Sequence, residues 1–139
     1  YRLNSMSAEV KTGLNDVRVV EEAYHAEFGQ YLAAAPEPPT IPGSSAATFN
    51  HAGTVFGTLG FRPEGQVYFS YGVGVSADGI GFTADAGADV DADGVVQFWG
   101  FAKPDGSNAK VSGQVGCNVS AIGVMELRAC GAGYGQSIF

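Results

Sequence analysis

Three aspartates alternate between Asp89 and Gly94, in the order Asp89, Asp91 and Asp93. Alternate carboxylates followed by glycine form the first half of many calcium-binding loops, because Ca2+ prefers oxygen ligands and glycine permits the sharp turn. Gly100 stands where such a loop would carry its bidentate glutamate. Two interpretations remain open: a calcium site, and a β-turn whose aspartates bond their own backbone, which the missing glutamate favours.

Cys117 and Cys130 are the only two cysteines of the chain. In an exported protein an even number of cysteines implies a disulfide, whereas two buried free thiols are the alternative in a cytosolic protein. No Cys-x-x-Cys motif or histidine partner indicates zinc or redox chemistry. A disulfide between them would stabilise the fold by about 3 kcal/mol on the chain-entropy model.

Patterns that indicate catalysis are weak. Glu22 and His25 have the Glu-x-x-His spacing of di-iron helix bundles, but that chemistry needs two such motifs on facing helices. A solvated helix face is therefore favoured. The chain has no Gly-x-Ser-x-Gly motif and only two histidines that could serve as a base. We therefore expect no enzymatic activity, no catalytic residue, and no cofactor other than the candidate calcium ion.

The composition favours a single domain with an unusually neutral surface. The chain has 139 residues, a net charge of −7 and only 15% charged residues, against about 25% in an average soluble domain. Burial in an assembly would explain so little charge. The seven basic residues are scattered along the sequence, so strong nucleic-acid binding is not expected.

A long amphipathic helix is predicted over residues 1–34. One apolar stripe steps by three or four positions through Leu3, Met6, Val10, Leu14, Val17, Tyr24, Phe28 and Tyr31. Glu21 interrupts the stripe, and Val20 is expected to cover that gap. The stripe is already present at Tyr1 with no capping residue before it, which indicates that an upstream piece has been removed.

Residues 35–65 are predicted to connect this helix to a sheet. The prolines that begin at Pro36 cannot continue a helix, so an ordered surface loop is expected over residues 35–50. A short turn or helix should follow and pack against the core. Its expected apolar anchors are Phe49, Val55, Phe56, Leu59 and Phe61.

Residues 66–139 are predicted to form an antiparallel sheet and a C-terminal region. Apolar residues alternate over 67–75 and 80–86, and residues 95–102 are predicted as a third strand. With glycine-containing turns between these runs, a meander should lay one face on the helix. Small residues suit a close approach of helix and sheet: Gly72, Gly74, Ala84 and Ala86. The fold class is thus α+β with three or four strands, and the irregular segment 110–139 is expected to depend on the cysteines.

Residues 8–14 (AEVKTGL) and 17–31 (VRVVEEAYHAEFGQY) resemble the emergent half of the spine helix of bacterial type IV pilins. Residues 59–62, 68–71 and 91–94 and the late cysteine pair also occur where such pilin heads carry similar elements. In that family a short leader is cleaved. The next ~25 residues then form an apolar helix that anchors in the inner membrane and later bundles inside the filament. The resemblance implies a pilin-like head that lacks this apolar half.

The resemblance further implies a structural subunit of an extracellular, cell-surface pilus. Such a subunit would be N-methylated and would form a helical homo-oligomer that serves attachment, twitching motility or DNA uptake. By this resemblance Tyr1, Arg2, Leu3 and Met6 would contact other subunits. A Cys117–Cys130 disulfide would bound the C-terminal loop.

Two alternatives remain beside the pilin interpretation. A pseudopilin of a type II secretion system belongs to the same superfamily, and a true calcium site at Asp89, Asp91 and Asp93 would favour it. A secreted carbohydrate-binding module belongs to another class and would use the aromatic residues of the sheet, Tyr68, Tyr71, Trp99 and Phe101. That module requires Trp99 to be exposed.

Overall fold

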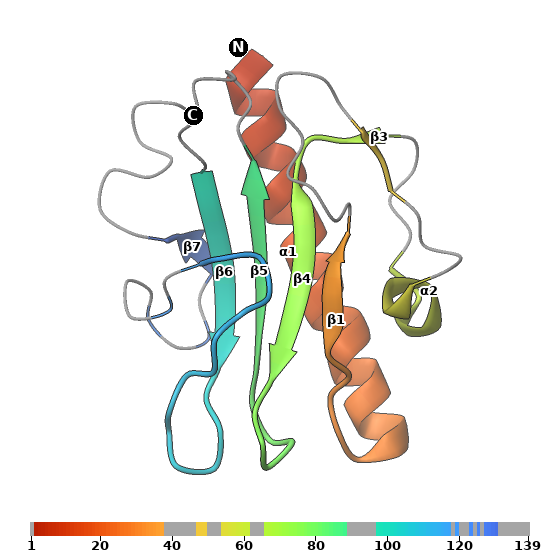
Figure 1. The fold of residues 1–139 in the computed structure, drawn as a ribbon, viewed down its shortest axis with the longest axis vertical. Helices are drawn as coiled ribbons and strands as arrows, with labels where there is room; N and C mark the ends of the chain where they lie inside the picture. Colours follow the sequence, from red (N-terminus) through yellow and green to blue (C-terminus); the bar gives the residue numbers. More distant parts are fainter. Residues whose placement is uncertain are drawn as a thin grey trace.

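The computed structural model describes residues 2–37, 47–49, 54–61, 66–88, 97–117, 119, 123, 125 and 127–130. One long helix lies behind an antiparallel sheet, and short elements flank both (Figure 1). The elements are α1 (Arg2–Phe28), β1 (Ala34–Glu37), β2 (Ala47–Thr48), α2 (Val55–Leu59), β3 (Gln66–Val67), β4 (Ser70–Val75), β5 (Phe82–Ala88), β6 (Gln97–Lys103) and β7 (Leu127–Ala129). The predicted α+β class is confirmed.

The main sheet has the strand order β1-β4-β5-β6-β7, and every neighbouring pair is antiparallel. The predicted meander is confirmed as β4, β5 and β6, in which Ala84 pairs with both Val73 and Phe101. The short β7 continues this meander to four strands, as expected, and β1 adds a further strand beside β4. A separate two-stranded ladder joins β2 and β3.

β1 corrects the prediction that residues 35–50 begin as a loop. Ala34 pairs with Val73 and Glu37 with Tyr71, and the register shifts between these two pairs. Pro36 lies inside that irregular stretch. Proline cannot donate a backbone hydrogen bond, so it is confined in sheets to edge strands and bulges, which is the place it occupies here.

Helix α1 ends at Phe28 rather than continuing to residue 34. Gly29 has a φ angle of 80°, and its N–H donates to the carbonyl of His25 over 2.8 Å. A glycine in the left-handed conformation is a common helix terminator, because it satisfies carbonyls of the last turn without a Cβ clash.

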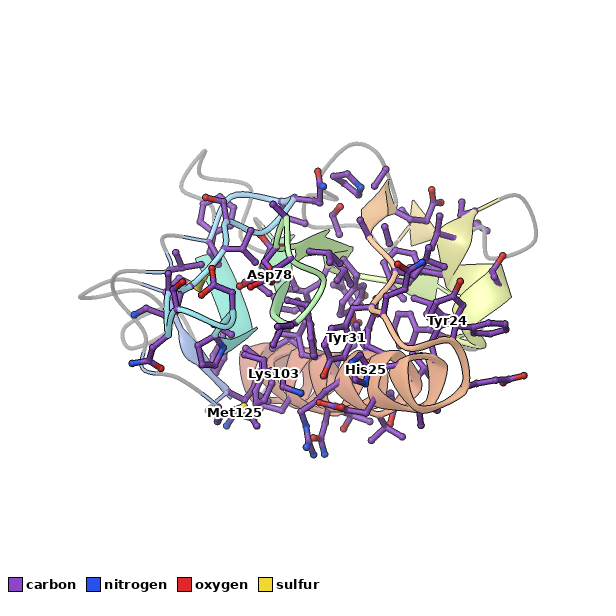
Figure 2. The ribbon with its side chains drawn as sticks, turned by 90° about the horizontal axis from the view of Figure 1, so that it is seen from below. Tyr24, His25, Tyr31, Asp78, Lys103 and Met125 are labelled. Atoms are coloured by element: carbon purple, nitrogen blue, oxygen red, sulfur yellow. A yellow bond between two sulfur atoms is a disulfide. The ribbon has the colours of Figure 1, made fainter. Side chains whose placement is uncertain are left out.

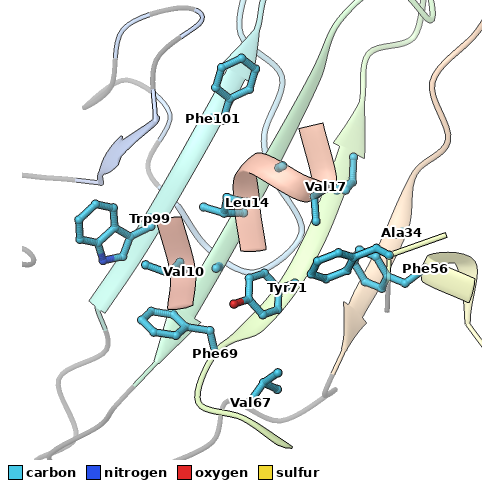
Figure 3. Close-up of a cluster of buried hydrophobic side chains, with 14 of the residues drawn as sticks. Val10, Leu14, Val17, Ala34, Phe56, Val67, Phe69, Tyr71, Trp99 and Phe101 are labelled. Atoms are coloured by element: carbon cyan, nitrogen blue, oxygen red, sulfur yellow. The ribbon is translucent and has the colours of Figure 1, made fainter. Parts of the chain in front are cut away.

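The middle of the predicted stripe is confirmed as the face that packs on the sheet. Val10, Leu14 and Val17 are each 0% exposed and belong to one apolar cluster with residues of β4, β5 and β6 (Figure 3). The ends of the stripe differ from the prediction. Val20 packs against the core as expected, but Glu21 is itself fully buried beside it, and Phe28 is 59% exposed.

The connection between helix and sheet supplies the predicted aromatic anchors. Phe49, Phe56 and Phe61 are buried, and Val55 and Leu59 pack at their side. The rings of Phe56 and Phe61 lie 5.4 Å apart in an edge-to-face arrangement. This cluster continues into the main core through Tyr71, whose ring is 5.4 Å from that of Phe61.

Gly13 is the point of closest approach between α1 and the sheet. A Cβ atom built there would lie 2.6 Å from the hydroxyl oxygen of Tyr71 and 2.8 Å from its ring. Tyr71 is buried and its hydroxyl donates to Glu9 over 2.8 Å, so the ring has little freedom to move. The absence of a side chain at position 13 therefore sets the spacing of helix and sheet.

Gly13→Ala should destabilise the protein although it replaces glycine inside a helix. Alanine favours the helix by about 1 kcal/mol, but overpacking against Tyr71 costs about 1–3 kcal/mol. We expect a net loss of up to about 2 kcal/mol in the free energy of unfolding, measured by denaturant titration. Thr12→Ala, at the neighbouring exposed position, should leave stability equal or slightly higher. A Gly13→Ala protein at least as stable as the unchanged chain would contradict this packing.

The face of the sheet opposite α1 is covered by residues 111–117, which cross the strands in front of the sheet (Figure 1). A Cβ at Gly74 would lie 2.1 Å from the carbonyl oxygen of Ser112, and one at Gly72 would lie 2.9 Å from Cβ of Gln114. These two glycines therefore allow residues 111–117 to approach the sheet closely. The prediction that they serve the close approach of the helix was wrong. Only Ala84 and Ala86 of the predicted small residues face the helix-side core.

Candidate functional site

The predicted subunit-contact residues lie at the start of α1. Tyr1 falls outside the described residues, and for Arg2, Leu3 and Met6 only the helical backbone is described. The first turns of α1 extend beyond the ends of the strands along the long axis of the molecule (Figure 1). The helix thus has a segment that packs on the sheet and a segment that projects past it.

The predicted calcium residues Asp89, Asp91 and Asp93 lie outside the described residues. Within the described ranges, no group of three or more histidine, cysteine, aspartate or glutamate side chains is placed to hold a metal ion.

The two cysteines form the disulfide Cys117–Cys130, with the Cα atoms 5.5 Å apart. Both cysteines are buried together with Ala102, and Phe98 packs against this group. This small cluster lies on the side of the sheet opposite α1, because Phe98 and Ala102 alternate with Trp99 and Phe101 of the helix-side core. The disulfide therefore closes the C-terminal region onto the outer face of the sheet.

The aromatic residues proposed for a sugar-binding face are mainly core residues. Tyr71, Trp99 and Phe101 are buried, with Trp99 only 8% exposed, and Tyr68 is partly buried. Lys11 lies 5.6 Å above the indole of Trp99, and Arg18 lies 5.4 Å above the ring of Phe101. The exposed Trp99 that a carbohydrate-binding module requires is not found.

The outward face of α1 carries an open pocket and isolated apolar side chains. The pocket has a volume of about 420 Å³ and is lined by Lys11, Thr12, Asn15, Asp16 and Leu127 of β7. Val19 is 55% exposed on the same helix. A lysine and an aspartate in one open pocket suit polar contact with another surface better than enclosure of a small molecule.

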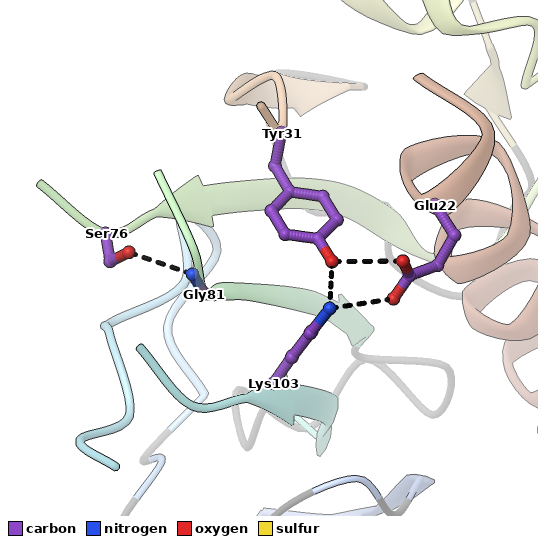
Figure 4. A network of polar contacts seen from close by, with 5 residues as sticks. All are labelled: Glu22, Tyr31, Ser76, Gly81 and Lys103. Carbon is purple, nitrogen blue, oxygen red and sulfur yellow. Dashed lines mark hydrogen bonds and ion pairs between the residues drawn. The ribbon is translucent and has the colours of Figure 1, made fainter. Parts of the chain in front are cut away.

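The C-terminal half of α1 is connected to the sheet by a polar network (Figure 4). The hydroxyl of Tyr31 donates to Glu22 over 3.0 Å, Lys103 of β6 donates to the same hydroxyl, and Lys103 lies 3.5 Å from the second Glu22 oxygen. Burial raises the pKa of Tyr31. Burial alone would lower the pKa of Lys103, but the bonds to Tyr31 and Glu22 raise it.

His25 belongs to the same region of α1. Its ring stacks on Tyr31 with centroids 4.4 Å apart, and Figure 2 shows the two side chains together near Lys103. Glu22, the acidic partner in the Glu-x-x-His spacing, is bonded to Tyr31 and Lys103 instead. The motif therefore attaches the helix end to the sheet.

Two further glutamates of α1 are functional candidates that sequence reasoning missed. Glu9 accepts hydrogen bonds from the backbone N–H of Tyr68 over 3.1 Å and from the hydroxyl of Tyr71 over 2.8 Å. Burial raises the pKa of Glu9, although both bonds act against this rise. Glu9 thereby links α1 to β4, which contains Tyr71, and to Tyr68 just before that strand.

Glu21 is the more unusual of the two. One carboxylate oxygen accepts the backbone N–H of Leu32 over 2.9 Å, and the other has no hydrogen-bond partner among the described residues. Burial, with a smaller contribution from the charge of Glu22, raises the pKa of Glu21 to about 7. The only signal in the sequence for this burial was the position of Glu21 within the apolar stripe. A polar residue on the buried face of a helix is itself buried.

Asp85 of β5 is a further buried acid, on the face of the sheet opposite α1. It is 0% exposed and accepts four backbone N–H groups, from Gln114, Val115, Gly116 and Cys117, over 2.9 to 3.2 Å. Burial raises its pKa, and the four backbone groups oppose that rise. The carboxylate therefore holds the segment that leads into the disulfide.

These features define a disulfide-closed α+β domain whose N-terminal helix is attached to an antiparallel sheet by the carboxylates of Glu9 and Glu22. No family model, curated protein or solved structure matches the chain. Among the described residues, neither helix combines the length and the apolar character needed to cross a bilayer.

Proposed function

We propose that this chain is the globular head of a type IV pilin-like subunit that polymerises into an extracellular filament. The observation that carries the proposal is α1, a helix of 27 residues. Its middle packs on the sheet and its first turns project beyond the strands (Figure 1). A helix so placed can continue as an apolar spine without disturbing the packing of the head.

Three further features support assembly with other copies of the chain. The outward face of α1 presents the open pocket beside β7 and the exposed Val19. The low charge of the chain leaves a neutral surface that burial between subunits would cover. The disulfide attaches the C-terminal region to the sheet, which suits a subunit exposed outside the cell.

Terminal sequencing and intact mass of the native protein, recovered from sheared cell-surface material, test this proposal. We expect a longer chain with about 25 apolar residues before Tyr1, N-methylated at its first residue, in a fraction that contains filaments. Material from cells in which the gene is disrupted is the matched control and should lack both filaments and this mass. A native terminus at Tyr1 behind a cleaved secretory signal would overturn assembly through a membrane helix.

A further inference from the structure

The disulfide joins two segments that the structure holds in place by other contacts as well. Cys117 ends the segment whose backbone N–H groups point at Asp85 of β5, and its own N–H donates to that carboxylate over 3.2 Å. Cys130 follows β7, and its N–H donates to the carbonyl of Phe98 on β6 over 2.8 Å. Cys117 is thus held by a contact to β5, and Cys130 is held by a separate contact to β6.

The backbone N–H groups of residues 114–117 surround the Asp85 carboxylate closely, and we call this arrangement the cradle. One carboxylate oxygen accepts from Val115, Gly116 and Cys117, and the other accepts from Gln114. A Cβ at Gly113 would lie 2.4 Å from the carboxylate, so only glycine lets the backbone approach this closely. Gly116 has a φ angle of 145°, which turns consecutive N–H groups toward one acceptor at a position that favours glycine.

A second side chain on the same strand fixes the start of this segment. The hydroxyl of Thr83 donates to the carbonyl of Val111 over 2.6 Å. Thr83 and Asp85 are both 0% exposed and project from the same face of β5. Residues 111–117 are therefore bound to the sheet by five hydrogen bonds that do not involve sulfur.

We propose that Asp85 is a positioning residue for disulfide formation. Its carboxylate gathers residues 114–117 onto the sheet in the reduced protein and places the Cys117 thiol beside that of Cys130 before the bond closes. The step is ordinary thiol–disulfide exchange. The two thiols lose two protons and two electrons to one molecule of oxidised glutathione, which becomes two molecules of reduced glutathione, while one sulfur–sulfur bond forms in the protein.

The equilibrium between reduced and oxidised protein in glutathione buffers tests this role. It gives the effective concentration of one thiol at the other, which is in the millimolar range for a flexible loop and much higher for pre-positioned groups. Asp85→Asn removes one acceptor oxygen and turns an amide donor toward the backbone N–H groups. We expect the effective concentration to fall at least about tenfold, because buried donors lose their acceptor.

Asp78→Asn is the matched control. Asp78 also accepts two backbone N–H groups, those of Ile80 and Gly106, each over 3.0 Å, but it lies on the β4–β5 turn and contacts neither cysteine segment. This variant should leave the thiol–disulfide equilibrium within about twofold of the unchanged protein, since it does not touch the cradle. An Asp85→Asn equilibrium equal to that of Asp78→Asn would overturn the proposal.

Hydrogen exchange provides a second measurement that does not depend on the Asp85 variant folding well. In Cys117→Ser/Cys130→Ser no disulfide can form, and the amides of residues 114–117 should still exchange at least about 100-fold more slowly than in an unfolded chain. Adding Asp85→Asn to this background should abolish that protection. Unprotected amides in the double serine variant, with α1 still protected, would show that the disulfide places the segment and would overturn the proposal.

Discussion

Glu21→Gln should raise the free energy of unfolding at pH 8 and leave it nearly unchanged at pH 4. Burial raises the pKa of Glu21 to about 7, from the value of 4.5 that is usual for glutamate. A difference of this size corresponds to about 3 kcal/mol between the protonated and charged forms. The glutamine keeps an acceptor for the N–H of Leu32 but places an amide group where one oxygen has no described partner. We therefore expect a gain of about 1–3 kcal/mol at pH 8.

The direction of this pH dependence follows from where the proton is held more tightly. The folded-state pKa of Glu21 lies above the unfolded value, so its stabilising contribution is complete below pH 4.5 and is lost as the pH rises through about 7. The difference between Glu21→Gln and the unchanged protein should grow across this window. Urea titrations at several pH values measure it, and the comparison cancels the contributions of Glu9 and Asp85.

Glu22→Gln is the matched control for Glu21, one position along the helix. Glu22 is half-exposed and interacts with Lys103 and Tyr31, so losing its charge should reduce stability slightly at pH 8 instead of raising it. A Glu21→Gln gain that stays constant between pH 5 and 8 would show that Glu21 does not titrate in this range.

Cys117→Ser/Cys130→Ser should lower the free energy of unfolding by about 3 kcal/mol. The disulfide closes a loop with a sequence separation of 13 residues, and the lost restriction of the unfolded chain has about this size. The helix-side core contains neither cysteine, so the packing of α1 on β4, β5 and β6 should persist. Denaturant titration with near-ultraviolet circular dichroism measures both properties.

Reduction with dithiothreitol is the internal control for this second result. It should lower the stability of the unchanged protein by a similar amount and leave the double serine variant unaffected. Equal stability of the oxidised and reduced forms would mean that the disulfide gives no net stabilisation. That outcome would contradict the entropic origin of the stabilisation.

Much of the fold was predictable because it depends on local periodicity. The spacing of Val10, Leu14 and Val17 is a helical pattern whatever lies beneath it, and the alternation over β4, β5 and β6 is equally local. The strands at the two sides were not predictable in this way. β1 contains a proline and β7 is three residues long, so both depend on a neighbour already in place.

The candidate site was predictable only in part. The pairing of Cys117 with Cys130 is confirmed, since two cysteines offer a single pairing once the chain is oxidised. The contacts proposed for Arg2, Leu3 and Met6 and the calcium site at Asp89, Asp91 and Asp93 stay predictions. The carboxylates that organise the interior, Glu9, Glu21 and Asp85, were not identified beforehand.

The sequence by itself determined the long helix, the meander, the aromatic anchors around Phe56 and the identity of the disulfide partners. Each of these depends on spacing along the chain or on a count of residues. Only the tertiary structure decided which segment packs against Gly72 and Gly74 and where the buried acids lie. Gly72 and Gly74 meet residues more than 35 positions away, and Asp85 meets backbone groups about 30 positions away. No local pattern encodes such contacts, because they join segments that are distant in the sequence and meet only when the C-terminal segment packs on the sheet.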